Sequence, residues 1–147
     1  MSDLVELVRS IIEGLERGNP QPLLQTLSDR VEWNEAENGP YWDGAAFVGG
    51  EAIMANVFAR IQQDFQDLRL TVRRVVGCGN TVLVEGRYSA VSKANGQSLD
   101  AQVAHIWDFE NGKVIRWQQY TDTWQFAKVT GTSPKQTPNS DRSGPRV

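Results

Sequence analysis

Residues 101–123 read AQVAHIWDFENGKVIRWQQYTDT, and this stretch decides the fold. Two long segments rich in β-branched and aromatic residues flank Asn111-Gly112, a dipeptide that is the strongest short-range hairpin signal. Strand alternation places Val103, His105 and Trp107 on one side of the first segment. His105 is the single histidine of the chain. One titratable side chain on an apolar sheet face is typical of a small-molecule pocket.

The sequence before this hairpin supplies helices first and strands afterwards. Apolar residues at helical spacing predict helices over 3–17 and 51–65, and Asn19-Pro20 predicts a short helix that runs to Leu27. Alternating patterns and turn residues predict strands over 30–36, 68–76, 80–93, 97–109 and 113–124, with a brief strand at Phe47-Val48 and with Trp124 at the end of the last strand. We therefore expect an α+β fold in which a curved antiparallel sheet forms a cone around the N-terminal helices.

The length of 147 residues is enough for one domain with a substantial core. We place this domain at 1–127. Residues 128–147 are rich in Ser, Thr, Pro and Gly, a composition that buries little apolar surface, so they are expected to form a flexible C-terminal tail. The formal net charge is −3, and an acidic body argues against nucleic acid as a partner.

Cysteine and hydropathy patterns bear on location and cofactors. Cys78 is the sole cysteine, so no internal disulfide and no cysteine-based metal cluster can form. The acidic N-terminus is unlike a signal peptide, and no apolar run reaches the roughly 18–20 residues that a membrane span needs. We expect a cytoplasmic protein without membrane contact. One histidine and scattered carboxylates do not predict a zinc site, and we expect no metal or redox cofactor.

Two groups of residues carry a family resemblance. The first runs from His105-Ile106-Trp107 through Gly112-Lys113 to the segment 119–123, and the second comprises the segments 33–36, 40–41 and 48–50. Over residues 3–126 the chain resembles the nuclear transport factor two-like superfamily, in its SnoaL-like, ketosteroid-isomerase-like branch. The resemblance implies an α+β cone and a homodimer formed through the sheet. Members include isomerases, polyketide cyclases, dehydratases, epoxide hydrolases and non-catalytic binding modules, so the fold alone does not define a function.

The resemblance also indicates which sheet face is concave. In the cyclases and epoxide hydrolases a catalytic aspartate aligns with Gln119, and the hydrolases carry an Arg/Asp pair near Gly86 and Tyr88. Glutamine cannot take up a proton, so neither mechanism transfers directly. With strand alternation, the resemblance implies a concave face that carries Trp33, Glu35, Gly86, Tyr88, Val103, His105, Trp107, Trp117, Gln119 and Thr121.

Two of these residues are candidate catalytic groups. His105, with an ordinary pKa near 6.5, would transfer protons near neutral pH; the alternative is an inert, hydrogen-bonded histidine in the pocket wall. Burial beside Trp33 would raise the pKa of the Glu35 carboxyl, as general acid–base work requires. The alternative is a solvated glutamate, since Glu32 and Glu37 lie close by.

The candidate substrate-binding residues are Trp33, Tyr41, Tyr88, Val103, Trp107, Trp117, Gln119 and Asp122. The tryptophans are either pocket walls for a flat ligand or residues of the core or dimer interface. Tyr41 and Trp42 either cover the cavity mouth or simply pack. Asp122 falls on the face opposite Gln119, where it would pair with an arginine or a turn amide, unless a bulge shifts it toward the pocket.

These expectations converge on a pocket protein for a small apolar organic ligand. The leading hypothesis is a cofactor-free acid–base enzyme, of isomerase, cyclase, dehydratase or hydrolase type, that acts on a compound with a carbonyl or hydroxyl group. Glu35 would move the proton, while His105, Tyr88 and Gln119 would hold the substrate oxygen. One alternative is a non-catalytic ligand-binding or dimerisation module. Another is a purely structural dimer whose cavity is filled by side chains.

Overall fold

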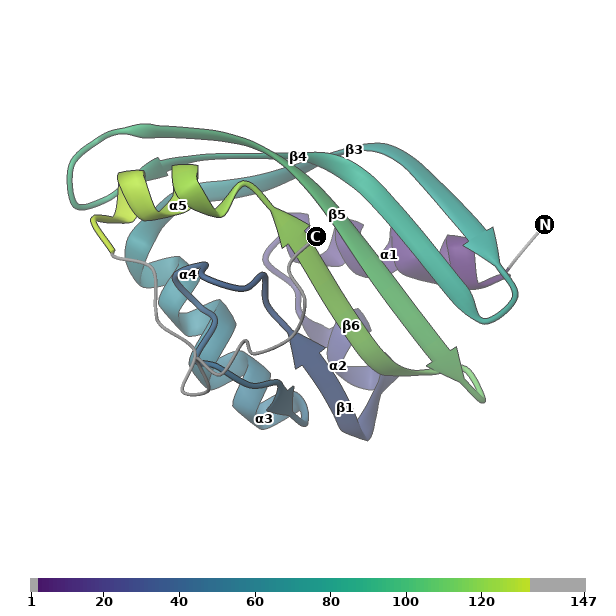
Figure 1. The fold of residues 1–147 in the computed structure, drawn as a ribbon. Coiled ribbons are helices and arrows are strands. Elements are labelled where there is room, and N and C mark those ends of the chain that lie inside the picture. Colours follow the sequence, from purple (N-terminus) through teal and green to yellow (C-terminus); the bar gives the residue numbers. More distant parts are fainter. Residues whose placement is uncertain (1–2, 133–147) are drawn as a thin grey trace, which may run out of the picture.

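A computed structural model describes residues 3–132, which form helices packed against one curved, unclosed sheet (Figure 1). The helical elements are α1 (Asp3–Glu16), α2 (Gln21–Thr26), α3 (Gly50–Ile53), the π-helix η1 (Met54–Phe58), α4 (Ala59–Asp64) and α5 (Thr123–Thr130). The strands are β1 (Leu27–Asn34), β2 (Phe47–Val48), β3 (Phe65–Cys78), β4 (Thr81–Ser92), β5 (Ser98–Glu110) and β6 (Lys113–Thr121). The predicted α+β class is confirmed.

The six strands lie in the order β2-β1-β6-β5-β4-β3. From β3 to β6 each strand pairs antiparallel with the next, as the hairpin signals predict. The pair β1–β6 is parallel, with Trp33 opposite Trp117, and this pairing was not predicted. Parallel neighbours need a long connection, and the chain from α3 to β5 supplies it.

The helices cover the sheet with their apolar stripes. The predicted stripe of α1 is confirmed, because Val8, Ile11 and Ile12 are buried in the main core together with Val31 of β1 and Val114 of β6. The helix predicted over 51–65 runs from Gly50 to Asp64 and contains the π-helical turn η1. A wider turn changes which side chains face inward, and π-turns recur at functional sites.

Strands β3 and β4 approach each other closely at Gly86. A Cβ atom at this position would lie 2.4 Å from the backbone oxygen of Thr71, so no side chain fits there. The β3–β4 register shifts beside this point, between Val72 and Arg74. Bulges bend and twist a sheet, so this one contributes to the curvature that encloses a space above the concave face.

The prediction that the last strand runs to Trp124 is wrong. Strand β6 ends at Thr121, and Trp124 lies on helix α5 with 71% of its surface exposed. The Asp122 side chain accepts a hydrogen bond from the backbone N–H of Gln125 and thereby caps α5. Since capping requires the chain to leave the strand, the sheet stops here. Figure 1 shows α5 beside the end of β4 and the start of β5.

The predicted domain boundary at 127 also falls inside α5. The helix continues to Thr130, and Val129 is 3% exposed in a second core cluster with Phe126. The rest of the predicted tail lies outside the described residues. Within residues 3–132, no helix is both long enough and apolar enough to cross a lipid bilayer.

Candidate functional site

A cavity of about 440 Å³ lies between the concave face of the sheet and the helices. Small-molecule sites begin at roughly 300 Å³, so this space suffices for a ligand. The cavity is therefore not filled by side chains, as the purely structural alternative assumed. The lining includes the predicted residues Trp33, Glu35, Tyr88, His105, Trp107, Trp117 and Gln119.

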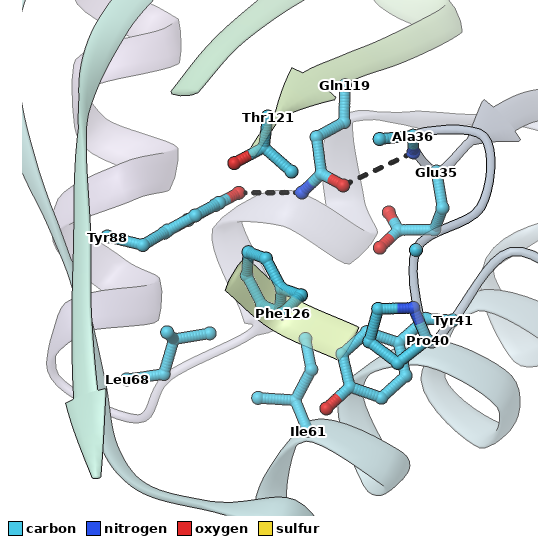
Figure 2. Close-up of a pocket in the computed structure, with 11 residues that line it drawn as sticks. Glu35, Ala36, Pro40, Tyr41, Ile61, Leu68, Tyr88, Gln119, Thr121 and Phe126 are labelled. Carbon is cyan, nitrogen blue, oxygen red and sulfur yellow. Dashed lines mark hydrogen bonds between the residues drawn. The ribbon is translucent and has the colours of Figure 1, made fainter. Parts of the chain in front are cut away.

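A smaller cavity, of about 20 Å³, shares several lining residues with the large one. Figure 2 shows the residues that line the smaller cavity. Glu35, Tyr88 and Gln119 line both spaces and so stand between them. Tyr41, which belongs to the loop that follows β1, lines only the smaller cavity. The predicted pocket residues therefore do not all face the same space.

Glu35 follows the end of β1 and is 5% exposed. The indole Nε1–H of Trp33 donates a hydrogen bond of 2.9 Å to its Oε2 atom. Burial raises the pKa of the Glu35 carboxyl from 4.5 to about 7, while the Trp33 hydrogen bond and the positive charge of Arg60 oppose this rise. Because the pKa lies near neutral pH, the group can both accept and release a proton there.

His105 is 5% exposed, and its Nε2 atom lies 2.7 Å from the Tyr88 hydroxyl. Burial lowers the pKa of His105 from 6.5 to about 3. The ring is therefore neutral near pH 7, and the expectation of an ordinary histidine pKa is corrected. Burial raises the pKa of Tyr88, so its hydroxyl keeps its hydrogen. In this state His105 can donate or accept hydrogen bonds but takes up no proton near neutral pH.

Gln119 lies on β6 and connects this strand to the chain that follows β1, its parallel neighbour. Its Oε1 atom accepts a hydrogen bond of 3.3 Å from the backbone N–H of Ala36, and its Nε2 donates one of 2.8 Å to the Tyr88 hydroxyl (Figure 2). These contacts connect β6 to the end of β1 and to β4. Gln119 thus has both ends of its amide engaged by the protein itself.

Three tryptophans form one wall of the large cavity. The rings of Trp33 and Trp117 stack at a centroid distance of 3.8 Å with 14° between their planes. Trp107 meets both of them edge-on, at 6.1 and 6.3 Å. Trp107 and Trp117 are direct cross-strand partners, and all three rings belong to the main core. They therefore serve as core residues and as cavity wall at the same time.

The loop after β1 is fastened to helix α4. The Tyr41 hydroxyl donates a hydrogen bond of 2.9 Å to Asp64, and the Arg60 guanidinium lies 5.4 Å above the Tyr41 ring. Arg60 also donates to the backbone oxygen of Pro40 at 2.7 Å. Trp42 is 8% exposed. Tyr41 and Trp42 are thus buried by packing, and Tyr41 helps to cover the smaller cavity.

Two predicted substrate-binding residues do not line either cavity. Val103 is buried in the second core cluster, to which Tyr88 and Leu99 also belong. Asp122 is the N-cap of α5, so its partner is the turn amide of Gln125 rather than a ligand. Thr121, also predicted on the concave face, lines the smaller cavity.

Replacing Asp122 with alanine should cost about 1 kcal/mol of stability, because the N-cap bond is lost and α5 frays from the core. Asp122→Asn, which keeps a capping oxygen, serves as the matched control. Urea denaturation followed by tryptophan fluorescence measures both variants. Equal midpoints for Asp122→Ala and the unmodified protein would remove the capping role.

Sequence patterns missed several lining residues. Glu16 lines the large cavity, and its side chain accepts a hydrogen bond of 2.7 Å from the backbone N–H of Leu70. Met54, Val57 and Phe58 reach the cavity from the π-turn η1. The apolar stripe of the third helix indicated its buried side, but a π-turn has no sequence signature. Among residues 3–132 no cluster of three or more His, Cys, Asp or Glu could hold a metal ion.

Solved structures with this fold are numerous. An NTF2-like protein from Burkholderia thailandensis aligns over 88% of this chain and 98% of its own, with a TM-score of 0.81 and 26% identity. TerC, co-crystallised with polyporic acid, aligns over 89% and 100%, with a TM-score of 0.78 and 23% identity. A protein of ketosteroid isomerase-like fold from Catenulispora acidiphila, in complex with trimethylamine, aligns over 90% and 98%, with a TM-score of 0.72 and 18% identity. The fold class is therefore NTF2-like.

The SnoaL-like domain model matches residues 8–117, about three quarters of the chain. The chain belongs to the SnoaL-like family of the NTF2-like superfamily, as the sequence resemblance implied. No curated protein matches the chain in sequence.

Proposed function

We propose that this protein is a cofactor-free acid–base enzyme that moves a proton next to a carbonyl group of an apolar small molecule. The observation that carries the proposal is the buried Glu35 carboxyl, whose pKa lies near 7 and which lines a cavity of about 440 Å³. A general base works best when its pKa is close to the working pH. Perturbed carboxyls in apolar cavities are candidates for this role.

The chemical step is a proton transfer. The Glu35 carboxylate takes a proton from the carbon next to the carbonyl, and the C–H electron pair forms a C=C bond as the carbonyl π pair moves onto oxygen. The polar side chains that line the cavity stabilise the developing oxyanion; among them neutral His105 is held by Tyr88, and Tyr88 is held by Gln119. The protonated Glu35 then returns the proton to the same or a neighbouring carbon. Isomerisation, cyclisation and dehydration can begin with this step.

Two structural neighbours support a small-molecule role. TerC was crystallised with polyporic acid, and the ketosteroid isomerase-like protein with trimethylamine. Both share the fold at low identity, so they support the use of the cavity for a small organic compound and not a particular reaction.

Hydrogen–deuterium exchange of 2-tetralone in D₂O tests the proposal. This bicyclic ketone is apolar and has exchangeable hydrogens next to its carbonyl group. The protein should accelerate the exchange above the rate in buffer alone, and the rate should rise with pH through about 7 as Glu35 loses its proton. Proton NMR follows the loss of the signal. Binding of the ketone without acceleration at any pH would contradict the enzyme proposal.

The alternative is a non-catalytic ligand-binding module with the same cavity. Gln119 favours this reading, because the catalytic relatives that the sequence resembles carry an aspartate at this position. Binding without exchange, in the experiment above, is the result that this alternative expects.

We further propose that the protein forms a homodimer through the sheet. Large apolar side chains lie exposed on strands β3 to β6, namely Val76, Leu83, Val91, Ile115 and Tyr120. A sheet face of this kind gains stability when it is covered by another surface. Analytical ultracentrifugation should give twice the chain mass of 16.4 kDa, and a monomer at micromolar concentration would contradict this proposal.

A further inference from the structure

Glu35 lies at the point where β1 leaves the sheet. The last paired residues of β1 and β6 are Asn34 and Gln118. One residue beyond Glu35, the backbone N–H of Ala36 donates to the Oε1 atom of Gln119 at 3.3 Å. This bond continues the contact between the two segments after β1 has ended. Glu35 therefore lies between a residue held by strand pairing and a residue held by the Gln119 side chain.

Other contacts of the loop that begins at Ala36 lead away from β6. The Ala36 oxygen accepts from the backbone N–H of Gly39 at 3.0 Å, which closes a turn within the loop itself. Farther along, the Arg60 guanidinium donates to the backbone oxygen of Pro40 and fastens that part of the loop to helix α4. Gln119 is therefore the residue that joins the start of this loop, next to Glu35, to strand β6.

The Gln119 amide is itself held in one orientation. The backbone N–H of Ala36 can only donate, so the amide atom that faces it is the oxygen, and the NH₂ group faces Tyr88 (Figure 2). This group donates to the Tyr88 hydroxyl at 2.8 Å, and the hydroxyl lies 2.7 Å from His105 Nε2. His105 is also the direct cross-strand partner of Gln119. Strands β4, β5 and β6 thus fix the amide together.

The position of Glu35 decides what its carboxyl can do. The Oε2 atom accepts from the Trp33 indole at 2.9 Å, and the residue lines both cavities. A general base must lie within hydrogen-bond reach of the proton that it removes, and a displacement of about 1 Å can slow a reaction roughly 10²-fold. Gln119 is only 9% exposed and both ends of its amide are bonded, so it resists such a displacement.

We propose that Gln119 is a positioning residue for Glu35, whose carboxyl it holds in place through the hydrogen bond to the backbone of Ala36. This inference rests on the proposed function, because it takes Glu35 as the base. Gln119 moves no proton itself and acts through Glu35. An amide suits this role because it accepts from Ala36 and donates to Tyr88 at once, without adding a charge beside the Glu35 carboxyl.

Amide hydrogen exchange in D₂O, followed by NMR, measures the anchor without any ligand. In the unmodified protein the Ala36 N–H should be protected to a similar degree as the amides of β1. Gln119→Met keeps the length of the side chain but removes the acceptor, so the Ala36 amide should exchange about tenfold faster or more. Gln119→Glu keeps an acceptor oxygen and should leave this amide protected. An unprotected Ala36 amide in the unmodified protein, or full protection in Gln119→Met, would overturn the inference.

The indole N–H signals show whether Glu35 itself moves. The Trp33 Nε1–H donates to the Glu35 carboxyl, so its NMR signal reports where that carboxyl lies. Gln119→Met should shift the Trp33 signal and leave that of the exposed Trp124 unchanged. The matched control is Gln102→Met, at an exposed position of β5, which should shift neither signal. An unshifted Trp33 signal in Gln119→Met, or an equal shift of all five indole signals, would contradict the positioning role.

Kinetics with 2-tetralone separate this inference from the proposed function. In Gln119→Met the kcat for deuterium exchange of the ketone should fall about 10- to 100-fold, while the KM changes little because the apolar walls remain. Gln102→Met should keep both constants. An unmodified kcat in folded Gln119→Met, together with a released Ala36 amide, contradicts only the positioning role. If the unmodified protein binds the ketone without exchanging its hydrogens, only the proposed function fails, and the amide and indole signals still decide whether Gln119 holds Glu35.

Discussion

Glu35→Gln is expected to slow the exchange of 2-tetralone by about 10²- to 10⁴-fold, the range that a positioned general base contributes. Glutamine has nearly the same shape and still offers an oxygen to the Trp33 indole, which donates at 2.9 Å in the structure. The variant therefore loses the proton acceptor while the surrounding contacts stay. The measurement is the exchange rate by NMR across pH 5 to 9, in which the rise through pH 7 should also vanish.

A matched control lies three residues earlier, on the strand that precedes Glu35. Glu32 is exposed on β1 and does not line either cavity, so Glu32→Gln should exchange at the unmodified rate. Circular dichroism and the melting temperature show whether both variants are folded. Exchange by folded Glu35→Gln at the unmodified rate would exclude Glu35 as the base.

The second large effect is on the pH dependence of stability. Between pH 4.5 and 7 the folded protein holds a proton on Glu35 that the unfolded chain has released, so raising the pH destabilises the fold. Between pH 3 and 6.5 the unfolded chain holds a proton on His105 that the folded protein lacks, so raising the pH stabilises the fold. Each slope is about 1.4 kcal/mol per pH unit, and from pH 4.5 to 6.5 they cancel.

Single variants should reveal how each group alone makes the unfolding free energy depend on pH, because removal of one group leaves the contribution of the other uncancelled. Glu35→Gln should gain about 2 to 3 kcal/mol of unfolding free energy from pH 4.5 to 6.5, since only the His105 slope remains. His105→Gln should lose a similar amount from pH 4.5 to 7. The double variant gives the baseline from all other groups. Urea denaturation at intervals of half a pH unit measures the four curves. Four parallel curves would show that neither group is perturbed by burial.

The hairpin and the inward faces could be predicted from sequence because their signals are local. Asn111-Gly112 fixes a turn, and strand alternation together with the family resemblance places His105 and Gln119 on the concave side. A register shift between Asp108 and Phe109, which was not predicted, sets His105 directly opposite Gln119. The same period places Trp33 and Glu35 inward from β1, and both line the cavity. The order of residues along a strand sorts them into two faces, and the family resemblance indicates which of the two faces is concave.

Other parts of the site depend on contacts between distant segments. The parallel pairing of β1 with β6, which brings Ala36 to Gln119, has no local signal. The pKa directions depend on burial, and Glu35 lies between two residues, Glu32 and Glu37, that are exposed. The start of helix α5, in contrast, has a local signal, because Asp122 followed by Gln125 resembles a capping box. It could therefore have been predicted from sequence, although it was not.

The parallel pairing also has a consequence for the chain during its synthesis. The backbone of Ala36 and its partner Gln119 are separated by 83 residues. At translation speeds of about 5 to 20 residues per second, the ribosome needs roughly 4 to 17 seconds to add that length. Throughout this interval β6 is not yet present to bury Glu35, so its carboxyl is exposed to water and has an ordinary pKa. In a nascent chain the Glu35 carboxyl is thus buried only after Gln119 has been added and β6 has docked beside β1.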